Sequence, residues 1–362
     1  MKILHTENSC GWGGQEIRIL TEATGLMKKG HEVALACPPE APIYEAARER
    51  GLVTLPAPIN RKNWRGLVAM YRLIRAWEPD IINTHSSTDS WLTAVAQLLG
   101  ASPAPIVRTR HISAPVSPSV SNRWLYGKAA RYVVTTGTRI RDELIEKRLV
   151  HPDRVASVHT GIDPERFRPG DRHQARAALG LDNQAFYLGI VATIRTWKGH
   201  AYLVEALARL PDAIHLLVIG DGPNRTAIES RVQELGLADR VRFVGHQQEV
   251  APWLQALDLF VLPSYANEGV PQSLMQAMLC RIPVVSTPVG SIEDIIHHQK
   301  TGWLVPPRDS NALTQALSHL YERADVREAM ASAGHEFASR HCTLDSMVEQ
   351  MDAIFRKVVD ER

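Results

Sequence analysis

The chain has 362 residues, of which 44% are hydrophobic and 22% charged, and its formal net charge is +2. This composition is typical of a globular protein, and no apolar run approaches the roughly 20 residues that a membrane-spanning helix needs. The length predicts two domains, each with its own core. Four cysteines without metal-ligand or redox spacing favour a reducing compartment, and we expect all four to be packing residues.

The charges divide unevenly along the chain. Residues 1–160 carry 21 lysines and arginines against 14 acidic residues, whereas the remainder carries 20 against 25. A basic first half suggests an anionic partner, such as a membrane surface or a phosphorylated substrate, although an incidental surface composition explains the charge equally well. The chain starts without an apolar signal region, so we expect a cytoplasmic protein, with peripheral contact at the inner face of the membrane as an open alternative.

Short β-branched runs alternate with helical patterns along the chain, which is typical of βαβ units and of parallel sheets covered on both faces. The predicted strands are residues 3–6, 33–37, 81–84, 106–109, 132–135 and 155–158, then 187–193, 215–219, 241–244, 259–262 and 284–286. We therefore predict an α/β fold with two doubly wound parallel-sheet domains facing across a cleft. The predicted domains are residues 1–165 and 166–344. A final helix over residues 345–362 follows, and one option is that it packs back on the first domain. Ligands bind at the carboxyl ends of such strands.

In the first domain, glycines and histidines follow the predicted strands. Gly13 and Gly14 precede a helix, where glycine lets the backbone approach an anion, although a structural turn is the alternative. The spacing matches neither a dinucleotide fingerprint nor a Walker loop. His85 and His111 each follow a strand end, where an imidazole can donate or accept a hydrogen bond in the expected cleft. Either histidine alone is more often structural.

A basic turn that contains Arg61, Lys62, Trp64 and Arg65 precedes an amphipathic helix. Such a turn is suited to an anionic membrane interface. The alternative that we favour is a solvated basic face with Trp64 packed inward.

In the second domain, Arg195 and Lys198 follow a strand. Together they are suited to holding a diphosphate, because the arginine guanidinium is a planar fork of donors and the lysine ammonium is a compact point charge. Surface cations in a loop are usually just solvated, which is the alternative. Phe243 and Val244 end another strand, near the expected place of a nucleotide base.

The polar turn after residues 259–262 contains Glu268 and leads into a helix with Pro271 predicted at its first position. The free NH groups and the dipole of that helix start favour a phosphate, with Glu268 beside it to bind hydroxyl groups. Metal-ligand clusters, a nucleophile elbow and long basic tracts are missing from the sequence. We therefore expect no metal, no cofactor and no nucleic-acid partner.

The chain resembles the retaining glycosyltransferases of the GT-B fold, in the family numbered four, because its motifs occur in the order that is typical of that family. The matching pieces, spread over nearly the whole chain, are Gly13-Gly14-Gln15-Glu16, Gly30-His31-Glu32-Val33, Trp197-Lys198-Gly199, Gly220-Asp221-Gly222-Pro223, Val241-Arg242-Phe243-Val244-Gly245, Glu268-Gly269-Val270-Pro271, Pro283-Val284-Val285 and Thr301-Gly302-Trp303-Leu304-Val305-Pro306.

The resemblance implies a reaction in which a sugar moves from a UDP- or GDP-linked donor to a hydroxyl of a saccharide or lipid-linked acceptor, with its anomeric configuration kept. It implies an acceptor-side first domain and a donor-binding second domain. The basic charge of the first domain leads us to expect a role in cell-envelope glycan or lipopolysaccharide synthesis. No metal is implied, so protein cations and helix-start NH groups stabilise the leaving diphosphate.

The resemblance also implies roles for particular residues. Lys198 and Arg195 would be the cations, Glu268 would accept hydrogen bonds from the sugar, and His111 would contact the sugar from the first domain. The Gly13-Gly14 loop would approach the donor phosphates or the acceptor. The remaining expected donor contacts are Thr193, Phe243, Val244, Gly269, Val270, Pro271, Gln272 and Gln276.

The chain departs from the family pattern at three positions. Gln276 replaces the second acid that holds the ribose, and an amide loses the advantage of a charge-assisted hydrogen bond. Thr193 stands where the family has an arginine, and Ser291 stands where a glycine is usual. Weaker or altered nucleotide binding is the expected result.

Two other functions stay open. A non-catalytic nucleotide-sugar-binding protein of the same fold would bind a donor without turnover. A nucleotide-sugar epimerase or a phosphorylase would give a different product, although no lysine context typical of pyridoxal phosphate is recognisable.

Overall fold

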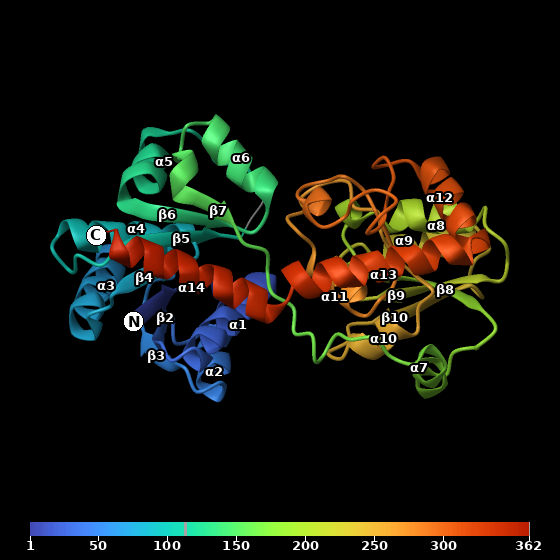
Figure 1. Ribbon diagram of the computed structural model, residues 1–362, viewed down its shortest axis with the longest axis horizontal. Helices are drawn as coiled ribbons and strands as arrows, with labels where there is room; N and C mark the ends of the chain where they lie inside the picture. Colours follow the sequence, from blue (N-terminus) through green and yellow to red (C-terminus); the bar gives the residue numbers. More distant parts are fainter. Residues whose placement is uncertain (112–113, 362) are drawn as a thin grey trace. The chain divides into compact units, whose positions relative to one another are not determined.

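The structure is a computed structural model that describes residues 1–111 and 114–361. The chain forms two compact units, Met1–Gly161 with Leu344–Arg362, and Ile162–Thr343, each built on one parallel sheet (Figure 1). The prediction of two doubly wound sheets is confirmed. The chain enters the second unit after Gly161 and returns after Thr343, against predicted boundaries at 165 and 344.

The first unit contains a seven-stranded sheet in the order β3-β2-β1-β4-β5-β6-β7, with every pair parallel. Its strands are β1 (Lys2–Thr6), β2 (Glu32–Cys37), β3 (Val53–Pro56), β4 (Ile81–Thr84), β5 (Ile106–Arg110), β6 (Ala130–Thr135) and β7 (Val155–Ser157). Its helices are α1 (Gly14–Lys28), α2 (Pro42–Glu49), α3 (Trp64–Trp77), α4 (Ser87–Leu98), α5 (Val120–Trp124), the π-helix η1 (Leu125–Ala129), α6 (Thr138–Glu146), the 3₁₀ helix η2 (Pro152–Arg154) and α14 (Leu344–Asp360).

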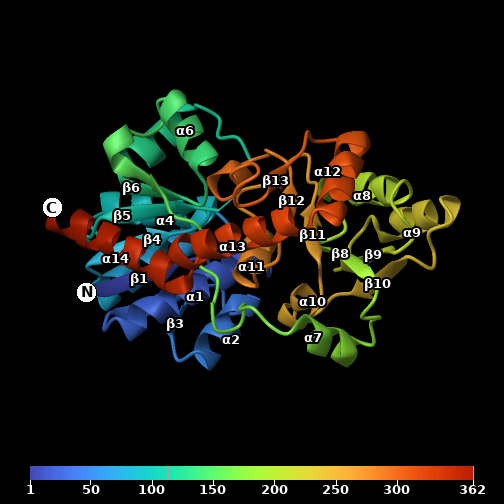
Figure 2. The same ribbon diagram turned by 45° about the vertical axis from the view of Figure 1, so that its right-hand side comes forward.

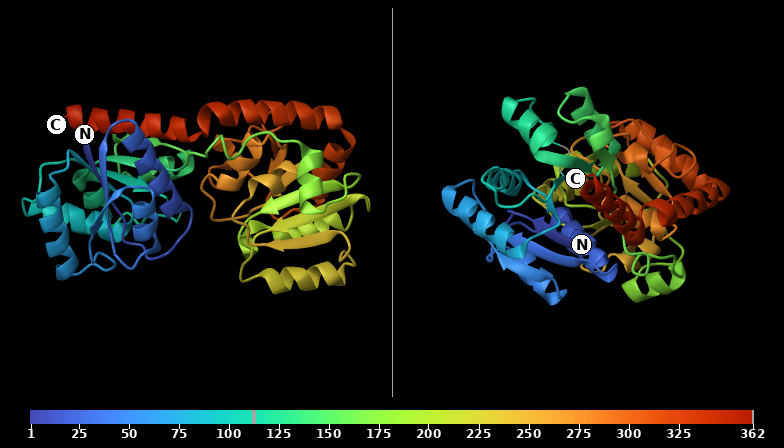
Figure 3. Two further views of the ribbon diagram at one scale, coloured as in Figure 1. Left: turned by 90° about the horizontal axis from the view of Figure 1, so that it is seen from below. Right: turned by 60° about the vertical axis from the view of Figure 1, so that its left-hand side comes forward.

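Helix α14 packs against α1 inside the first unit, although the whole second unit, Ile162–Thr343, separates it from the rest of the first unit in sequence (Figure 3). At the contact, a Cβ atom on Gly25 would lie 2.3 Å from a methyl carbon of Val348, so only glycine allows this approach. His31 Nε2 lies 2.9 Å from an oxygen of Asp352 and adds a polar link. The C-terminal helix is therefore part of the first core.

The second unit contains a six-stranded parallel sheet in the order β10-β9-β8-β11-β12-β13. Its strands are β8 (Phe186–Val191), β9 (Ile214–Ile219), β10 (Val241–Gly245), β11 (Leu259–Leu262), β12 (Val284–Ser286) and β13 (Trp303–Leu304). Its helices are α7 (Arg172–Leu179), η3 (Thr196–Lys198), α8 (His200–Leu207), α9 (Arg225–Glu234), α10 (Ala251–Gln255), α11 (Gln272–Leu279), η4 (Ile292–Asp294), α12 (Ser310–Glu322) and α13 (Ala324–His341). Helix α8 packs with α9 and α12, whereas α11 packs with α10 and α13 (Figure 2).

Some element boundaries differ from the prediction. Strand β8 ends at Val191 rather than at residue 193, because the backbone then turns away and Ile194 N bonds to Asp221 O in the next loop. Pro271 is the residue before α11 and not its first residue, with an extended backbone (φ −66°, ψ 126°). The short strands β3 and β13 were not predicted.

Two surface predictions were wrong. Trp64 is 71% exposed rather than packed inward, because it is the first residue of α3 and lies on its solvent side. Cys10 is exposed in the loop after β1, whereas the other three cysteines are buried as expected. Within residues 1–111 and 114–361, we find no helix with the length and apolar character to cross a bilayer.

Candidate functional site

The order of strands reverses once in each sheet, and these points are where doubly wound proteins bind ligands. In the second unit the chain builds β8, β9 and β10 in one direction and then places β11 on the other side of β8. The loops that follow β8 and β11 therefore diverge at the carboxyl edge of the sheet. They carry Lys198 and Glu268, respectively.

Lys198 and Glu268 form an ion pair at this point. Lys198 Nζ lies 2.7 Å from Glu268 Oε1, and Ser264 Oγ donates to the same oxygen at 2.6 Å. The Glu268 side chain is only 6% exposed and that of Lys198 is 20% exposed, so the pair is held out of bulk water. The structure thus brings together the acid and the cation that the sequence singled out.

Two glycines let the surrounding loops pack closely. Gly199 has φ +80°, and a Cβ atom there would lie 2.0 Å from Pro263 O. Gly290 has φ +69°, and its Cβ would lie 2.0 Å from Glu268 O. Ser291 N also donates to Gly269 O at 3.1 Å, which ties the loop after β12 to the Glu268 turn. The loop after β12 thus packs on the Glu268 turn itself, and the loop after β8 packs on Pro263 at the start of the same loop.

The structure does not bring Arg195 into this ion pair. Arg195 and Thr193 are exposed in the loop after β8, and the Arg195 guanidinium lies 5.1 Å from the centre of the Trp197 ring. Since β8 has already ended at Val191, strand alternation does not place the two residues on one side. Lys198 is therefore the cation that is fixed beside Glu268.

The remaining donor residues lie in two places. Gly269, Val270, Pro271 and Gln272 lead into α11, and Gln276 is half-buried one turn further on, on the Gln272 side of the helix. Phe243 and Val244 lie in the edge strand β10, just before its last residue, Gly245, and two strands away from β8. The Arg225 guanidinium lies 5.7 Å from the centre of the Phe243 ring.

In the first unit the strand order reverses between β1 and β4, and three histidines occur at this edge. His5 Nδ1 lies 2.9 Å from His85 Nε2, and His85 Nδ1 lies 2.9 Å from His111 Nε2. Burial lowers the pKa of His5 to about 3 and lowers the pKa values of His85 and His111 well below the usual range. The three rings are therefore neutral at pH 7.

Buried carboxylates surround the same edge. Glu7 Oε1 accepts from Ser86 Oγ at 2.6 Å, and its other oxygen accepts from the Gln15 amide at the start of α1. Asp89 accepts from Thr6 Oγ1 at 2.7 Å, and burial raises its pKa to about 7. This network fastens the ends of β1 and β4 to the starts of α1 and α4.

Gly13 precedes α1 with an extended backbone (φ −174°), which any residue can adopt. A Cβ atom at Gly13 would come no closer than 3.7 Å to Glu16 Oε2. The fold itself therefore gives no reason for glycine at this position, whereas close approach of a ligand would. Gly14 is the first residue of α1.

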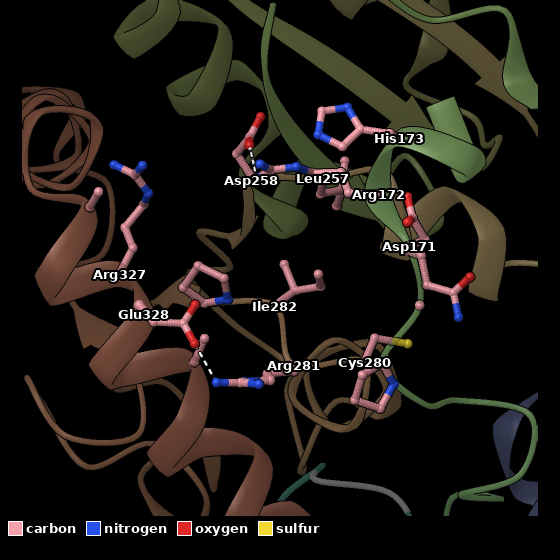
Figure 4. Close-up of a pocket in the computed structure, with 16 residues that line it drawn as sticks. Asp171, Arg172, His173, Leu257, Asp258, Cys280, Arg281, Ile282, Arg327 and Glu328 are labelled. Atoms are coloured by element: carbon pink, nitrogen blue, oxygen red, sulfur yellow. Dashed lines mark hydrogen bonds and ion pairs between the residues drawn. The ribbon is translucent and has the colours of Figure 1, made fainter. Parts of the chain in front are cut away.

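A cavity of about 570 Å³ in the second unit lies at the opposite edge of its sheet, where β11 and β12 begin (Figure 4). Four of its charged residues form two ion pairs, and the Arg327 guanidinium donates to backbone carbonyls. Arg172 is bonded to Asp258 at 2.5 Å, and Arg281 is bonded to Glu328. The cavity lies away from the carboxyl ends of the strands, where doubly wound sheets bind ligands, and we do not place the function there.

The residues of the two edges that sequence reasoning missed include His5, Ser264, Gly290 and the buried acids Glu7 and Asp89. His5 lies at the carboxyl end of a predicted strand, as His85 and His111 do, so the same rule would have found it. Ser264 is the second residue after β11. No sequence pattern indicated the role of Gly290, because this role depends on a contact with Glu268, which lies in another loop. Among the described residues, no group of three or more His, Cys, Asp or Glu side chains has the geometry of a metal site.

Family models match both units. A "Glycosyltransferase Family 4" model matches residues 12–166, and a "Glycosyl transferases group 1" model matches residues 185–323. D-inositol 3-phosphate glycosyltransferase from Stackebrandtia nassauensis is 30% identical over 78% of this chain and 70% of that protein. The protein of the same name from Mycobacterium marinum is 28% identical over 94% of this chain and 80% of its own length.

Solved structures share the fold across the whole chain. A glycosyltransferase from Rickettsia africae has a TM-score of 0.91 at 17% identity, covering 100% of this chain and 99% of its own. Anabaena HepE in complex with UDP-glucose has a TM-score of 0.83 at 21% identity, covering 99% of this chain and 100% of its own.

Two parallel-sheet units of this topology form the GT-B fold, which the chain shares with these solved structures. Within that class, the chain belongs to glycosyltransferase family 4, also described as group 1. The fold, the family and the enzyme class expected from the motifs are confirmed.

Proposed function

We propose that this glycosyltransferase moves a sugar from a UDP- or GDP-linked donor to a hydroxyl of a saccharide acceptor, with retention of configuration and without a metal. The observation that carries the proposal is the buried Lys198–Glu268 pair at the switch point of the second unit. One solved relative of this fold holds UDP-glucose, which makes UDP-sugars the first donors to test.

The two residues of the pair suit different parts of a nucleotide-sugar: Glu268 suits the sugar and Lys198 the diphosphate. Glu268 Oε1 already accepts from Lys198 and Ser264, so we assign Oε2 to the sugar hydroxyls. Lys198 Nζ has three hydrogens and gives one to Glu268, so it can donate to the leaving diphosphate as negative charge develops there. NH groups near Val270 to Gln272 add to the same stabilisation.

In the first unit we assign His111 to the donor sugar and the Gly13-Gly14 loop to the phosphates or the acceptor. Neutral His111 can donate or accept a hydrogen bond without adding charge. We assign the diphosphate charge to Lys198 with help from Arg195, and the ribose to Gln276.

A screen of UDP- and GDP-sugars, followed by nucleotide release and by the anomeric configuration of the product, tests the proposal. Glu268→Gln and Lys198→Ala should each reduce kcat/KM more than tenfold, since each loses at least one oriented contact worth about 1.4 kcal/mol. Glu328→Gln, which breaks the ion pair in the Figure 4 cavity, is the matched control and should keep full activity. Binding of a donor without turnover would instead favour a non-catalytic protein, and an isomerised donor would indicate an epimerase.

For the acceptor, we propose a cell-envelope glycan, such as a lipopolysaccharide core or a lipid-linked sugar. A phosphorylated acceptor is the second candidate, because Lys62 Nζ lies 3.3 Å from Ser87 Oγ at the start of α4. Burial, and then Arg108, lower the pKa of Lys62, and a phosphate there would offset both effects. The relatives named for D-inositol 3-phosphate make that compound the probe to compare with saccharide acceptors.

Peripheral membrane contact is a separate part of the proposal. Trp64 is 71% exposed at the start of α3, beside Arg61, Lys62 and Arg65. An exposed tryptophan among cations suits an anionic lipid surface. Binding to anionic vesicles should weaken with salt and with Trp64→Ala, whereas Leu98→Ala, at another exposed apolar position, should leave it unchanged. Equal binding to neutral vesicles would contradict the assignment.

A further inference from the structure

The three histidines of the first unit form an unbroken chain of hydrogen bonds across three neighbouring strands. His5 belongs to β1, His85 follows β4 and His111 follows β5, and β1, β4 and β5 are adjacent in the sheet. The ring centres are 5.2 Å and 5.1 Å apart, close to the roughly 4.8 Å between neighbouring strands. The sheet itself thus sets the spacing of the imidazoles.

The geometry is that of hydrogen bonding in the ring plane. The rings of His5 and His85 are parallel within 7°. Their centroid separation equals the 2.9 Å nitrogen–nitrogen distance plus the two ring radii, so the hydrogen bond lies along the line of centres. The second link has the same length, with the rings tilted by 32°.

Each of these rings carries one hydrogen. Burial lowers all three pKa values, and the nearby cations Arg18 and Arg108 lower those of His85 and His111 further. A neutral imidazole has one donor and one acceptor nitrogen, and the bond at one nitrogen fixes the role of the other. The hydrogens of the whole chain must therefore point in one direction.

The buried end of the chain decides that direction. His5 Nε2 is buried and has no hydrogen-bond partner within the described part of the chain. A buried N–H without an acceptor is rarer in proteins than an acceptor left incomplete. The hydrogen of His5 therefore belongs on Nδ1, which donates to His85 Nε2, and His85 Nδ1 in turn donates to His111 Nε2.

We propose that His5 and His85 are positioning residues that hold His111 in one tautomer, with its ring hydrogen on Nδ1. The proposal deepens the proposed function, in which His111 faces the donor sugar. Held in this way, His111 presents a hydrogen-bond donor to a sugar oxygen. Because the Nδ1–H tautomer is already present before the substrate binds, His111 does not have to change tautomer on binding. His5 reaches the site only through the two other rings.

Nitrogen-15 NMR of histidine-labelled, substrate-free protein tests the tautomer directly. We expect His111 to show a protonated Nδ1 and a bare, hydrogen-bonded Nε2 at pH 7. A hydrogen on Nε2, or an averaged signal from both tautomers, would overturn the proposal. Because no substrate is present, this result is independent of whether the protein transfers a sugar.

Variants at His5 test whether this residue sets the tautomer of His111 through His85. His5→Leu removes the donor to His85, whereas His5→Asn keeps an amide donor near the place of Nδ1. We expect His5→Leu to give mixed His111 tautomers and to lower kcat about tenfold with little change in KM, and His5→Asn to restore both. Unchanged His111 signals and kcat in folded His5→Leu would refute the role of His5. If the tautomer is as proposed but no donor is turned over, only the proposed function fails.

Discussion

Replacing Gly290 by alanine would test whether the loop after β12 fixes Glu268. The residue has φ +69°, and the added Cβ would lie 2.0 Å from the carbonyl oxygen of Glu268. This neighbour is backbone, so it cannot turn away as a flexible side chain could. The Glu268 turn would have to shift, and the 2.7 Å contact with Lys198 would shift with it.

Gly236 provides a matched control in the same unit. It has a similar φ of +67°, but a Cβ there would meet nothing within 4 Å. Gly236→Ala should therefore cost only the left-handed backbone strain, about 1–2 kcal/mol. Gly290→Ala should cost the same strain plus about 1–3 kcal/mol for the forced displacement. The difference between the two variants isolates the contact with Glu268.

Calorimetric unfolding and transfer kinetics of the two full-length variants measure this difference. We expect Gly290→Ala to unfold at a lower temperature than Gly236→Ala and to lose more than tenfold in kcat/KM, whereas Gly236→Ala keeps normal kinetics. Equal stability and equal kinetics in the two variants would show that Gly290 does not hold the Glu268 turn in place.

Three further predictions concern stability. Gly25→Ala should destabilise the first unit by about 1–3 kcal/mol, because its Cβ would meet Val348 at 2.3 Å; an unchanged melting temperature would contradict this. Asp258→Asn should cost about 3–5 kcal/mol in chemical unfolding, because buried Arg176, 2.5 Å away, loses its charged partner; a loss below 1 kcal/mol would show that the pair is dispensable. The folded-state pKa of His5, about 3, lies below the ordinary 6.5, so the unfolded chain takes up a proton first and stability falls as pH drops from 6.5 towards 3. His5→Asn should make that fall shallower in urea titrations between pH 7 and 4, and an unchanged slope would argue against it.

The alternation of strands and helices was readable from the sequence because buried parallel strands are short apolar runs with sharp ends. Strands β4, β11 and β12 were predicted to the residue. Strand β3 was missed because it has only two β-branched residues and ends in proline, and β13 is only two residues long. The prediction for β8 ran two residues too far because the apolar run continues through Ala192 and Thr193 is β-branched, while hydrogen bonds to another loop redirect the backbone.

Residues of the candidate site were predictable where a side chain follows a strand end. Glu268 and Lys198 follow this rule, and the structure joins them. Arg195 follows it too, but its guanidinium lies over Trp197 instead, which depends on local packing that no spacing rule contains. The chain of histidines could not be predicted, since it requires knowing that β1, β4 and β5 are neighbours.

The return of α14 to the first unit has a consequence for synthesis on the ribosome. The second unit is one continuous segment, Ile162–Thr343, and can complete its core while the C-terminal helix is still being made. Met347, Met351 and Phe355 belong to the core of the first unit, yet they emerge only after the whole of the second unit has been made. We therefore expect the first unit to finish folding after the second, with the α14-binding surface of α1 exposed until α14 has been made. A chain that stops before Leu344 would leave the second unit whole and the first incomplete.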